Sequence, residues 1–277
     1  MIKKSYSLGI NFRLGFTPLL SLIRHRSLLK GFVSKEIRGR FAGSMAGMAW
    51  TLIHPLALIA VYTFVFSIVL RISVTQEETG TDNFIIFFLA GMLPWLIFSD
   101  SLIRATGSLT GNSQLITKVV FPVELLPGSS VVAATITHGI GLALFLGYLA
   151  LTGHANTHWI FIFPLMLVHL VFTWGLALFL SALCVFIRDV QELVGIVIMV
   201  WFFTTPILYP VSFVPEWVRE FILYNPMAIL ILSYRDIVLL HRFYPSDFLI
   251  LSFIACACFL LGSWFFMRAK PAFGDVL

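Results

Sequence analysis

Apolar residues in this chain gather into long runs, without the alternation of apolar and polar positions that marks half-buried strands. The runs cover residues 47–70, 84–103, 128–151, 159–187, 193–210 and 247–267. Each is close to the length of about 17–25 residues that a helix needs to cross a hydrocarbon core of roughly 30 Å. The pattern therefore predicts an all-α polytopic membrane protein with six transmembrane helices.

A different periodicity precedes the first run. From Ser27 to Arg38, apolar residues recur at helical spacing on one half of the helical wheel, and polar residues fill the other half. The apolar half holds Leu28, Leu29, Phe32, Val33 and Ile37, and the polar half holds Lys30, Ser34, Lys35 and Arg38. We expect an amphipathic helix in the cytoplasmic membrane surface, with its cations facing anionic headgroups. An ordinary basic linker is the alternative.

The loop between the second and third runs, Gly107 to Pro127, is a further candidate for a surface element. Residues 112–120 are compatible with a short helix, and Asn112 or Ser113 is placed to cap its first turn. The helix must end before Phe121-Pro122, because the residue before a proline is disfavoured in helical angles. We expect a short helix that presents a docking surface to the cytosol, with a plain connecting loop as the alternative.

The fifth run does not lead directly into a returning span. Pro206, Pro210 and Pro215 stop the helix, and Asn225-Pro226 breaks the chain again before a semi-apolar run over residues 227–240. Between these breaks, charged residues mix with an aromatic one, as in segments at a membrane interface: Glu216, Trp217, Arg219 and Glu220. We expect a small irregular structure at the membrane surface, where a gate or a cap over a pathway would sit.

Composition agrees with a membrane class. Hydrophobic residues make up 59% of the chain, the mean hydropathy is +0.97, and charged residues are only 11%, against about 25% in soluble domains. We expect a cytoplasmic region over residues 1–46, a transmembrane domain over 47–267 and a cytoplasmic tail over 268–277. Arg13 and Pro18 interrupt the weak apolar run near the N-terminus and no cleavage pattern follows, so we expect no cleaved signal peptide.

The cations are distributed unevenly between the two sides of the membrane. If the N-terminus is cytoplasmic, 14 of the 18 Lys and Arg residues lie on that side. The remaining four are Arg71, Arg219, Arg235 and Arg242. Because cytoplasmic loops carry the excess of Lys and Arg, we expect both termini in the cytoplasm. The same asymmetry accounts for the net charge of +5, which therefore does not indicate a nucleic-acid partner.

Few residues offer catalytic or metal-binding chemistry. His54, His138 and His169 lie within apolar runs without a carboxylate or second histidine three or four positions away, so we interpret them as packed or pore-lining. Asp100 and Arg104 are one helical turn apart, and we expect a local ion pair. The three cysteines fall in apolar runs, and no GxxxxGK[ST] motif occurs. We expect no metal site, no disulfide and no nucleotide hydrolysis by this chain.

Aromatic residues are the main positive signal for a function. They make up 15% of the chain, with 28 Phe, 7 Trp and 7 Tyr. Tyr62, Phe64 and Phe66 lie in the first run, and Trp201, Phe202 and Phe203 lie in the fifth. Aromatic planes pack on the apolar faces of sugar rings, but Phe is also ordinary in helices that face lipid. A path for sugars and simple packing against lipid are both compatible with the pattern.

Three segments in this order resemble the permease subunits of ABC-2 type polysaccharide exporters. They are SKEIRGRFAGSMAGMAWTLIHPLALIAVYTFVFSIVL (Ser34 to Leu70), LITKVVFPVELLP (Leu115 to Pro127) and the stretch Phe186 to Met227, which begins FIRDVQELVG. With the six runs, the resemblance covers residues 27 to about 268. The chain is most similar to O-antigen/lipopolysaccharide export permeases, with capsule and teichoic acid permeases as close relatives. The resemblance assigns no role to the residues before Ser27.

The resemblance implies roles for particular residues. An interfacial helix near residues 27–40 and a coupling helix at about 112–121 would contact a separate ATP-binding subunit through Lys30, Lys35, Glu36, Arg38, Lys118, Phe121 and Glu124. The first and fifth spans of two identical subunits would line a channel with Trp50, Tyr62, Phe66, Trp201, Phe202 and Tyr209. Short re-entrant helices over residues 210–240 would gate the periplasmic exit with Pro210, Pro215, Trp217, Tyr224 and Asn225.

The resemblance also implies partners. These are a second copy of the chain, membrane lipids, undecaprenyl-linked polysaccharide and two copies of an ATP-binding subunit, which would hold the ATP and magnesium. The complex would lie in the bacterial inner membrane, and this chain would bind no cofactor and catalyse no reaction. ATP binding would move the coupling and interfacial helices, and the polymer would pass outward stepwise, held by weak aromatic contacts.

Two other classes of function are set against this hypothesis. A membrane-embedded lipid or sugar transferase would need acids or histidines clustered at one depth, and an ion-coupled transporter or channel would bury a carboxylate in mid-span. Neither pattern is visible in the sequence. The residues leave open whether the glycan is O antigen, capsule or teichoic acid, how long it is, whether the channel is open at rest and whether the ATPase carries a glycan-binding domain.

Overall fold

The computed structural model describes residues 12–40, 45, 47–50, 53, 57, 60–69 and 74–277, and the regular structure in this part of the chain is helical, without a β-strand. The α-helices are α1 (Phe12–Arg24), α2 (Arg26–Gly39), α4 (Gln76–Thr79), α5 (Phe84–Thr106), α6 (Ser113–Lys118), α7 (Leu125–Leu151), α8 (Ile162–Phe186), α9 (Val190–Thr204), α10 (Glu216–Tyr224), α11 (Pro226–Val238), α12 (Pro245–Ala269) and α13 (Phe273–Val276). Shorter helical turns are η1 (Gly47–Ala49), η2 (Thr63–Val69), η3 (Thr110–Asn112), η4 (Thr157–Phe161), η5 (Val211–Phe213) and η6 (Lys270–Ala272).

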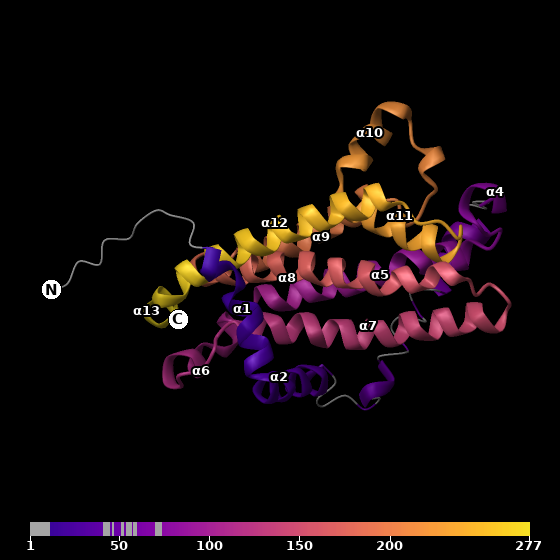
Figure 1. The fold of residues 1–277 in the computed structure, drawn as a ribbon. Coiled ribbons are helices and arrows are strands. Elements are labelled where there is room, and N and C mark those ends of the chain that lie inside the picture. The colour runs from indigo at the N-terminus through magenta and orange to yellow at the C-terminus, as the bar shows by residue number, and fades with distance from the viewer. Residues whose placement is uncertain are drawn as a thin grey trace.

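Four helical stretches in the described residues are long and apolar enough to cross a membrane. They are Gln76–Thr106, Leu125–Leu151, Thr157–Phe186 and Pro245–Val276. Their central helices, α5, α7, α8 and α12, run lengthwise through the bundle (Figure 1). The second, third, fourth and sixth apolar runs of the sequence therefore predicted these four elements correctly.

The predicted fifth span over residues 193–210 needs correction. Its helix, α9, has 15 residues, or about 22 Å at 1.5 Å per residue, which is shorter than the hydrocarbon core. It ends at Thr204 because Thr205 precedes Pro206 and adopts extended angles, φ −100° and ψ 132°. Helices α10 and α11 then follow with a bend of 92° between them. The described residues thus hold four crossings, or five if this bent pair is counted as one.

Most of the predicted first span, residues 47–70, lies outside the described residues. In its described part, residues 60–62 are α-helical and η2 has the hydrogen bonding of a π-helix. Tyr62 and Phe66 in this part pack against α5, with ring centroids 4.9 Å from Phe88 and 5.8 Å from Phe84. The packing places this part of the chain against the bundle, and the limits of the first span stay a prediction.

Helices α8 and α12 approach each other closely in the bundle. A Cβ atom added at Gly175 would lie 2.5 Å from the backbone nitrogen of Phe259, and one added at Gly262 would collide with the carbonyl of Gly175. Beside this contact, the Trp174 and Phe259 rings pack with centroids 5.1 Å apart. Small residues at such a crossing let two backbones approach, which is how spanning helices gain packing energy where water supplies no hydrophobic driving force.

Several short elements gather at one end of the bundle. Helix α2 packs against α7, α1 packs against α12 and α7, and α13 packs against α6 and α8. Figure 1 shows α6 and α13 at this end, with α4 at the opposite end. The predicted amphipathic segment at residues 27–38 therefore does form a helix, α2, and its Val33 is buried. That α2 lies in the membrane surface stays a prediction.

Candidate functional site

A groove of about 540 Å³ opens beside the C-terminal end of α9. It is lined by Trp201, Phe203, Thr204, Tyr209, Val218, Phe221, Ile222, Tyr224, Asn225 and Pro226. Half of these ten residues are aromatic, and Thr204, Tyr209, Tyr224 and Asn225 add hydrogen-bonding groups. Helix α10, which forms one wall, stands off the bundle (Figure 1). The groove is large enough for a small organic group such as a sugar ring.

Asn225 joins the parts of the chain that form the groove. Its Oδ1 accepts hydrogen bonds from Trp201 Nε1 at 2.7 Å and from the Met227 backbone nitrogen at 3.0 Å, and its Nδ2 donates to Thr205 Oγ1 at 3.0 Å. The bond to Met227 caps the first turn of α11, as expected of Asn before a helix-starting proline. One side chain therefore ties α9, the segment that follows it and α11 together.

The other residues predicted to form a gate have different positions. Pro215 precedes α10 and Pro210 precedes η5. Both prolines have extended ψ angles, and a new helical element begins at the residue after each. Tyr224 is exposed and lines the groove, and Trp217 is exposed on α10 outside the groove lining. Of the five predicted gate residues, the structure thus brings Tyr224 and Asn225 to the groove. The two prolines instead mark where η5 and α10 begin.

Arg235 holds the chain break after α9 from inside the bundle. The residue is only 4% exposed. Its guanidinium donates to the backbone carbonyl oxygens of Pro206 at 2.5 Å, Ile207 at 2.7 Å and Phe87 at 3.3 Å, and it lies 3.6 Å from the centroid of the Phe87 ring. The carbonyls at the chain break have no helical partner, so Arg235 on α11 satisfies them. The sequence places Arg235 only among the cations on the external side of the membrane and does not predict this role.

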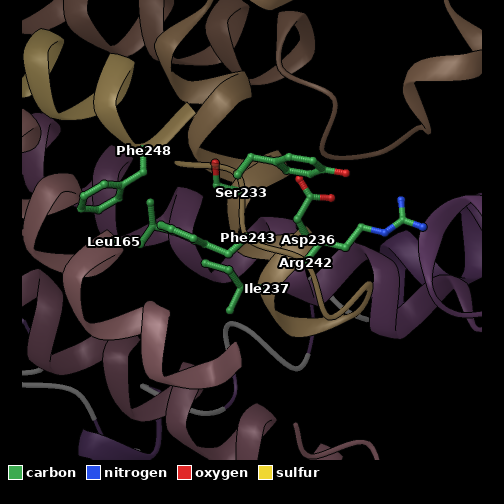
Figure 2. Close-up of a pocket in the computed structure, with 8 residues that line it drawn as sticks. Leu165, Ser233, Asp236, Ile237, Arg242, Phe243 and Phe248 are labelled. Carbon is green, nitrogen blue, oxygen red and sulfur yellow. The ribbon is translucent and has the colours of Figure 1, made fainter. Parts of the chain in front are cut away.

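A second cavity, next to α11, is too small to be a substrate site. Its volume is about 10 Å³, close to the minimum for a single water molecule. Figure 2 shows the apolar side chains of Leu165 and Phe248 on one side and those of Asp236 and Arg242 on the other. Phe243 next to it stacks on Phe161 with ring centroids 4.1 Å apart. The cavity is therefore a small gap in the packing between α8, α11 and α12.

The aromatic residues predicted to line a channel divide into two groups. Phe202 is buried, with its ring 6.3 Å from Tyr62 and 5.6 Å from Trp95, and Phe66 is stacked on α5. In the single chain these rings pack elements together and do not face an open path. Trp201 and Tyr209 line the groove, and Trp50 is exposed. The exposed face of α9 is made instead by Leu193, Ile196, Val197, Met199, Val200 and Phe203.

The residues predicted to couple the chain to an ATPase lie at the end of the bundle that carries α6. Lys35 Nζ on α2 donates to Asn112 Oδ1 at 3.1 Å, and the Phe32 and Phe121 rings have centroids 5.7 Å apart. Helix α6 covers six residues and is shorter than the predicted 112–121, because Val119 is already extended. The remaining predicted cations, Lys30, Arg38 and Lys118, are exposed. The two predicted coupling segments therefore touch each other.

The position of Glu124 corrects its predicted role as a direct docking residue. It is 3% exposed and its Oε2 accepts a hydrogen bond from Lys270 Nζ at 2.7 Å. This ion pair joins the start of α7 to the end of α12. Glu36, another predicted coupling residue, is partly buried and accepts a long bond of 3.5 Å from Ser130 Oγ on α7. Glu124 therefore acts within the chain, and the coupling role of Glu36 stays a prediction.

Asp100 lies at the centre of a charged cluster near the end of α5. It contacts Arg104 at 2.7 Å, Arg40 at 2.7 Å and His138 at 3.0 Å. The predicted pair with Arg104 is confirmed. His138 has no carboxylate three or four positions away in sequence, and its partner Asp100 comes from another helix. His169 is fully buried without a hydrogen-bond partner in the described residues, and His54 lies outside them. No group of acids, histidines and cysteines in the described residues is arranged to hold a metal ion.

Comparison with known proteins places these features in a family. Residues 27–239 match the family model described as ABC-2 type transporter. The chain is 29% identical to the O-antigen export system permease protein RfbA of Klebsiella pneumoniae over 278 residues, which cover 100% of this chain and 99% of the relative. A protein of the same name from Myxococcus xanthus is 35% identical over 224 residues, 80% of this chain and 84% of the relative.

A more distant relative carries a different name. The polysialic acid transport protein KpsM of Escherichia coli is 23% identical over 221 residues, 74% of this chain and 78% of the relative. The family match includes α2, α5, the loop that carries α6, and the segment from α9 to α11. The matched region is more than half of the chain and contains both the groove and the charged cluster around Asp100. The chain therefore belongs to the ABC-2 type transporter family.

Proposed function

We propose that this chain is the permease subunit of an ATP-driven exporter that carries a lipid-linked polysaccharide, O antigen, out of the bacterial cytoplasm. The observation that carries the proposal is the end-to-end similarity to an O-antigen export permease, 29% identity over the whole chain. The alternative cargo, capsular polysaccharide, is less favoured, since the relative named for polysialic acid transport is 23% identical over 74% of the chain. Wall teichoic acid is a further alternative.

The proposed channel is formed by two copies of the chain. Helix α9 and η2 both carry exposed apolar side chains, among them Met199 and Phe203 on α9 and Phe64 and Ile68 on η2. A second copy, or the polymer itself, would cover these faces, which a single chain leaves open. In this arrangement the first apolar run forms one further crossing, and α9 forms another only together with the non-helical residues that follow it, which gives six crossings per subunit with both termini in the cytoplasm.

The groove is the proposed exit gate for the glycan. Aromatic rings stack on sugar faces with about 1–3 kcal/mol each, by analogy with bases, so several rings guide a polymer without trapping it. Trp201, Tyr209 and Tyr224 would supply such contacts, and the Asn225 network would hold the gate helices in position. The prolines at residues 210 and 215 separate the gate elements from α9.

The opposite end of the bundle is the proposed contact with the ATP-binding subunit. Lys30, Arg38 and Lys118 are exposed there, and Val120 at the end of the α6 segment is completely exposed. The bond from Lys35 to Asn112 and the Phe32–Phe121 contact would move α2 and α6 as one unit. Movement of the ATPase would thereby reach α7, against which α2 packs. ATP and magnesium would remain on the partner.

The test is purification of the tagged chain from its native membrane, followed by identification of the associated proteins and of the glycan that accumulates when the chain is deleted. We expect a P-loop ATPase at two copies per two copies of the chain, and lipid-linked O antigen retained inside the deletion strain. Accumulation of capsular polymer would show that the cargo is capsular polysaccharide, and the chain would still be the permease of an exporter. A chain that is stable, active and free of any ATPase would overturn the proposal.

A further inference from the structure

A polar cavity lies between α2 and the ends of α5 and α7. Its volume is about 260 Å³, and it is lined by Phe32, Lys35, Glu36, Gly39, Arg40, Arg104, Ser108, Asn112, Leu126 and Ser129. Arg104 is in the last turn of α5, and Ser129 is in the second turn of α7. The cavity is therefore level with the ends of two spanning helices, which in a bilayer is the depth of the lipid headgroups.

Arg40 gives this cavity an unsatisfied donor. Its side chain is only 5% exposed, and its Nη2 lies 2.7 Å from Asp100 Oδ2. That contact is an ion pair, and the buried Nε has no hydrogen-bond partner in the described part of the chain. Burial lowers the pKa of the Arg40 guanidinium, and the neighbouring Asp100 carboxylate counteracts this. Because buried donors without acceptors are costly and rare, the Nε group of Arg40 is the donor that still lacks an acceptor.

The charges around the cavity also leave an excess. Lys35, Arg40 and Arg104 are cations, whereas Glu36 in the lining and Asp100 behind it are the carboxylates. Among these five side chains, three cations face two anions and one positive charge remains. Arg104 is bonded to Asp100 through its Nε, and its Nη groups have no hydrogen-bond partner among the described residues.

We propose that the cavity binds the phosphodiester group of an anionic membrane lipid. A phosphodiester carries one negative charge and several acceptor oxygens, which match the excess charge and the donors of Arg40 and Arg104. Basic pockets between spanning helices on the cytoplasmic side bind phospholipid headgroups by this chemistry. Phe32 and Leu126 border the same cavity and provide an apolar side for the glycerol and the beginning of an acyl chain.

A bound lipid would join two separate elements of the chain. Lys35 and Arg40 belong to α2 and the turn after it, and Arg104 belongs to α5. A phosphate between them fixes α2, with its coupling residues, to the spanning bundle. A pyrophosphate carries at least two negative charges, which is more than the one excess positive charge of the cavity. The site therefore favours a structural phospholipid over a pyrophosphate-linked cargo. The inference holds whatever polymer the protein carries.

The experiment uses the intact chain, with its ATPase if the two copurify, in detergent and in lipid nanodiscs. Phosphatidylglycerol is titrated while thermal unfolding is followed, and retained lipid is counted by native mass spectrometry. We expect one retained phosphatidylglycerol per chain and a rise in the unfolding midpoint of several degrees, because a ligand that binds only the folded state stabilises it. Arg104→Gln and Lys35→Gln should each weaken the apparent affinity at least tenfold.

The matched control is Arg38→Gln, which removes an exposed cation of α2 outside the cavity lining and should bind the lipid normally. Arg40→Gln is the strongest test if it folds, and the other two variants keep the test valid if it does not. Equal affinity of Arg104→Gln, Lys35→Gln and the unaltered chain overturns the proposal. Equal stabilisation by diacylglycerol also overturns it, and so does stabilisation by inorganic phosphate or pyrophosphate alone, which would identify a site for free anions. Loss of export with normal lipid binding would bear on the proposed function only.

Discussion

At the scale of single residues, Arg235 is the side chain that we expect to contribute most to the stability of the fold. Replacing it with Met removes three hydrogen bonds from a charged donor and leaves the carbonyls of Pro206 and Ile207 buried without that partner. Hydrogen bonds to charged groups contribute about 1.5–3 kcal/mol each. We expect Arg235→Met to lose at least about 3 kcal/mol of unfolding free energy, measured by denaturant or thermal unfolding in detergent.

The control for this prediction is Arg242→Met, since Arg242 is exposed and close in sequence. It should change stability by less than about 0.5 kcal/mol, as is usual for surface substitutions. Limited proteolysis adds a local readout, because release of the segment after α9 should expose residues 205–215 to cleavage in Arg235→Met alone. Identical stability and cleavage of the two variants would show that the carbonyls find other partners.

The ion pair of Lys270 with Glu124 provides a second test at this scale. Lys270→Glu places two carboxylates together at the junction of α7 and α12, and Glu124→Lys places two ammonium groups there. Glu124 is buried and Lys270 is partly exposed, and a buried carboxylate that loses its partner or meets a like charge destabilises the fold, so both single variants should unfold at lower temperature. The double variant restores opposite charges and should recover most of the loss. Additive losses in the double variant would contradict a direct interaction.

Pattern recognition found only the local part of the charged cluster. Asp100 and Arg104 are four positions apart on one helix, a spacing that predicts contact. His138 is 38 positions from Asp100 and comes from another helix, so no periodicity within a segment brings the two together. The count of cations assigns Arg235 to the external side of the membrane and does not identify its partners, because these lie 28 to 148 positions away in the sequence. Its position in the semi-apolar run over residues 227–240 was the only available signal.

At the scale of elements, the crossing of α8 and α12 depends on two glycines. Gly175→Leu would force a side chain into the backbone of Phe259, and bulky groups inserted in a packed interior cost about 1–3 kcal/mol even when neighbours adjust. Backbone cannot adjust as side chains do, so we expect the upper end of that range or failure to assemble. Yield and monodispersity on size-exclusion chromatography measure the effect.

Gly139→Leu is the matched control, because Gly139 lies in the spanning helix α7 and a Cβ there meets nothing within 4 Å. It should leave yield and unfolding temperature unchanged within error. A similar loss in both variants would mean that leucine at any of these glycines disturbs membrane insertion, and the close crossing would then carry no special weight.

The elements that were predicted correctly share one property. Helices α5, α7, α8 and α12 are continuous apolar stretches with few breaks, so length alone identifies them. Prediction failed where local chemistry ends a helix early. Helix α9 ends at Thr204, two residues before Pro206. Phe121-Pro122 predicts the end of α6, but the chain is already extended at Val119. Hydropathy windows average over such boundaries and cannot resolve them.

At the scale of the whole molecule, the two ends of the bundle have different proposed roles. The groove and the Asn225 network lie around the chain break after α9, and the charged cluster, α2 and α6 lie at the end that carries α13. Helices α5 and α7 connect the regions, with α2 on one side of α7. An ATP-driven movement must therefore pass through the packed interior of the chain, where Glu124 with Lys270 and Asp100 with Arg40 join separate elements.

This division predicts that only one end of the bundle binds the ATPase. Val120, beyond α6, and Leu151, the last residue of α7, are almost completely exposed apolar residues near opposite ends of the chain's long axis. An aspartate in an apolar docking surface costs desolvation energy and typically weakens binding by more than 2 kcal/mol, about thirtyfold. Val120→Asp should therefore lose copurifying ATPase and export together, whereas Leu151→Asp should retain the ATPase. Loss of the ATPase from Leu151→Asp with full retention by Val120→Asp would reverse the orientation of the chain in the membrane.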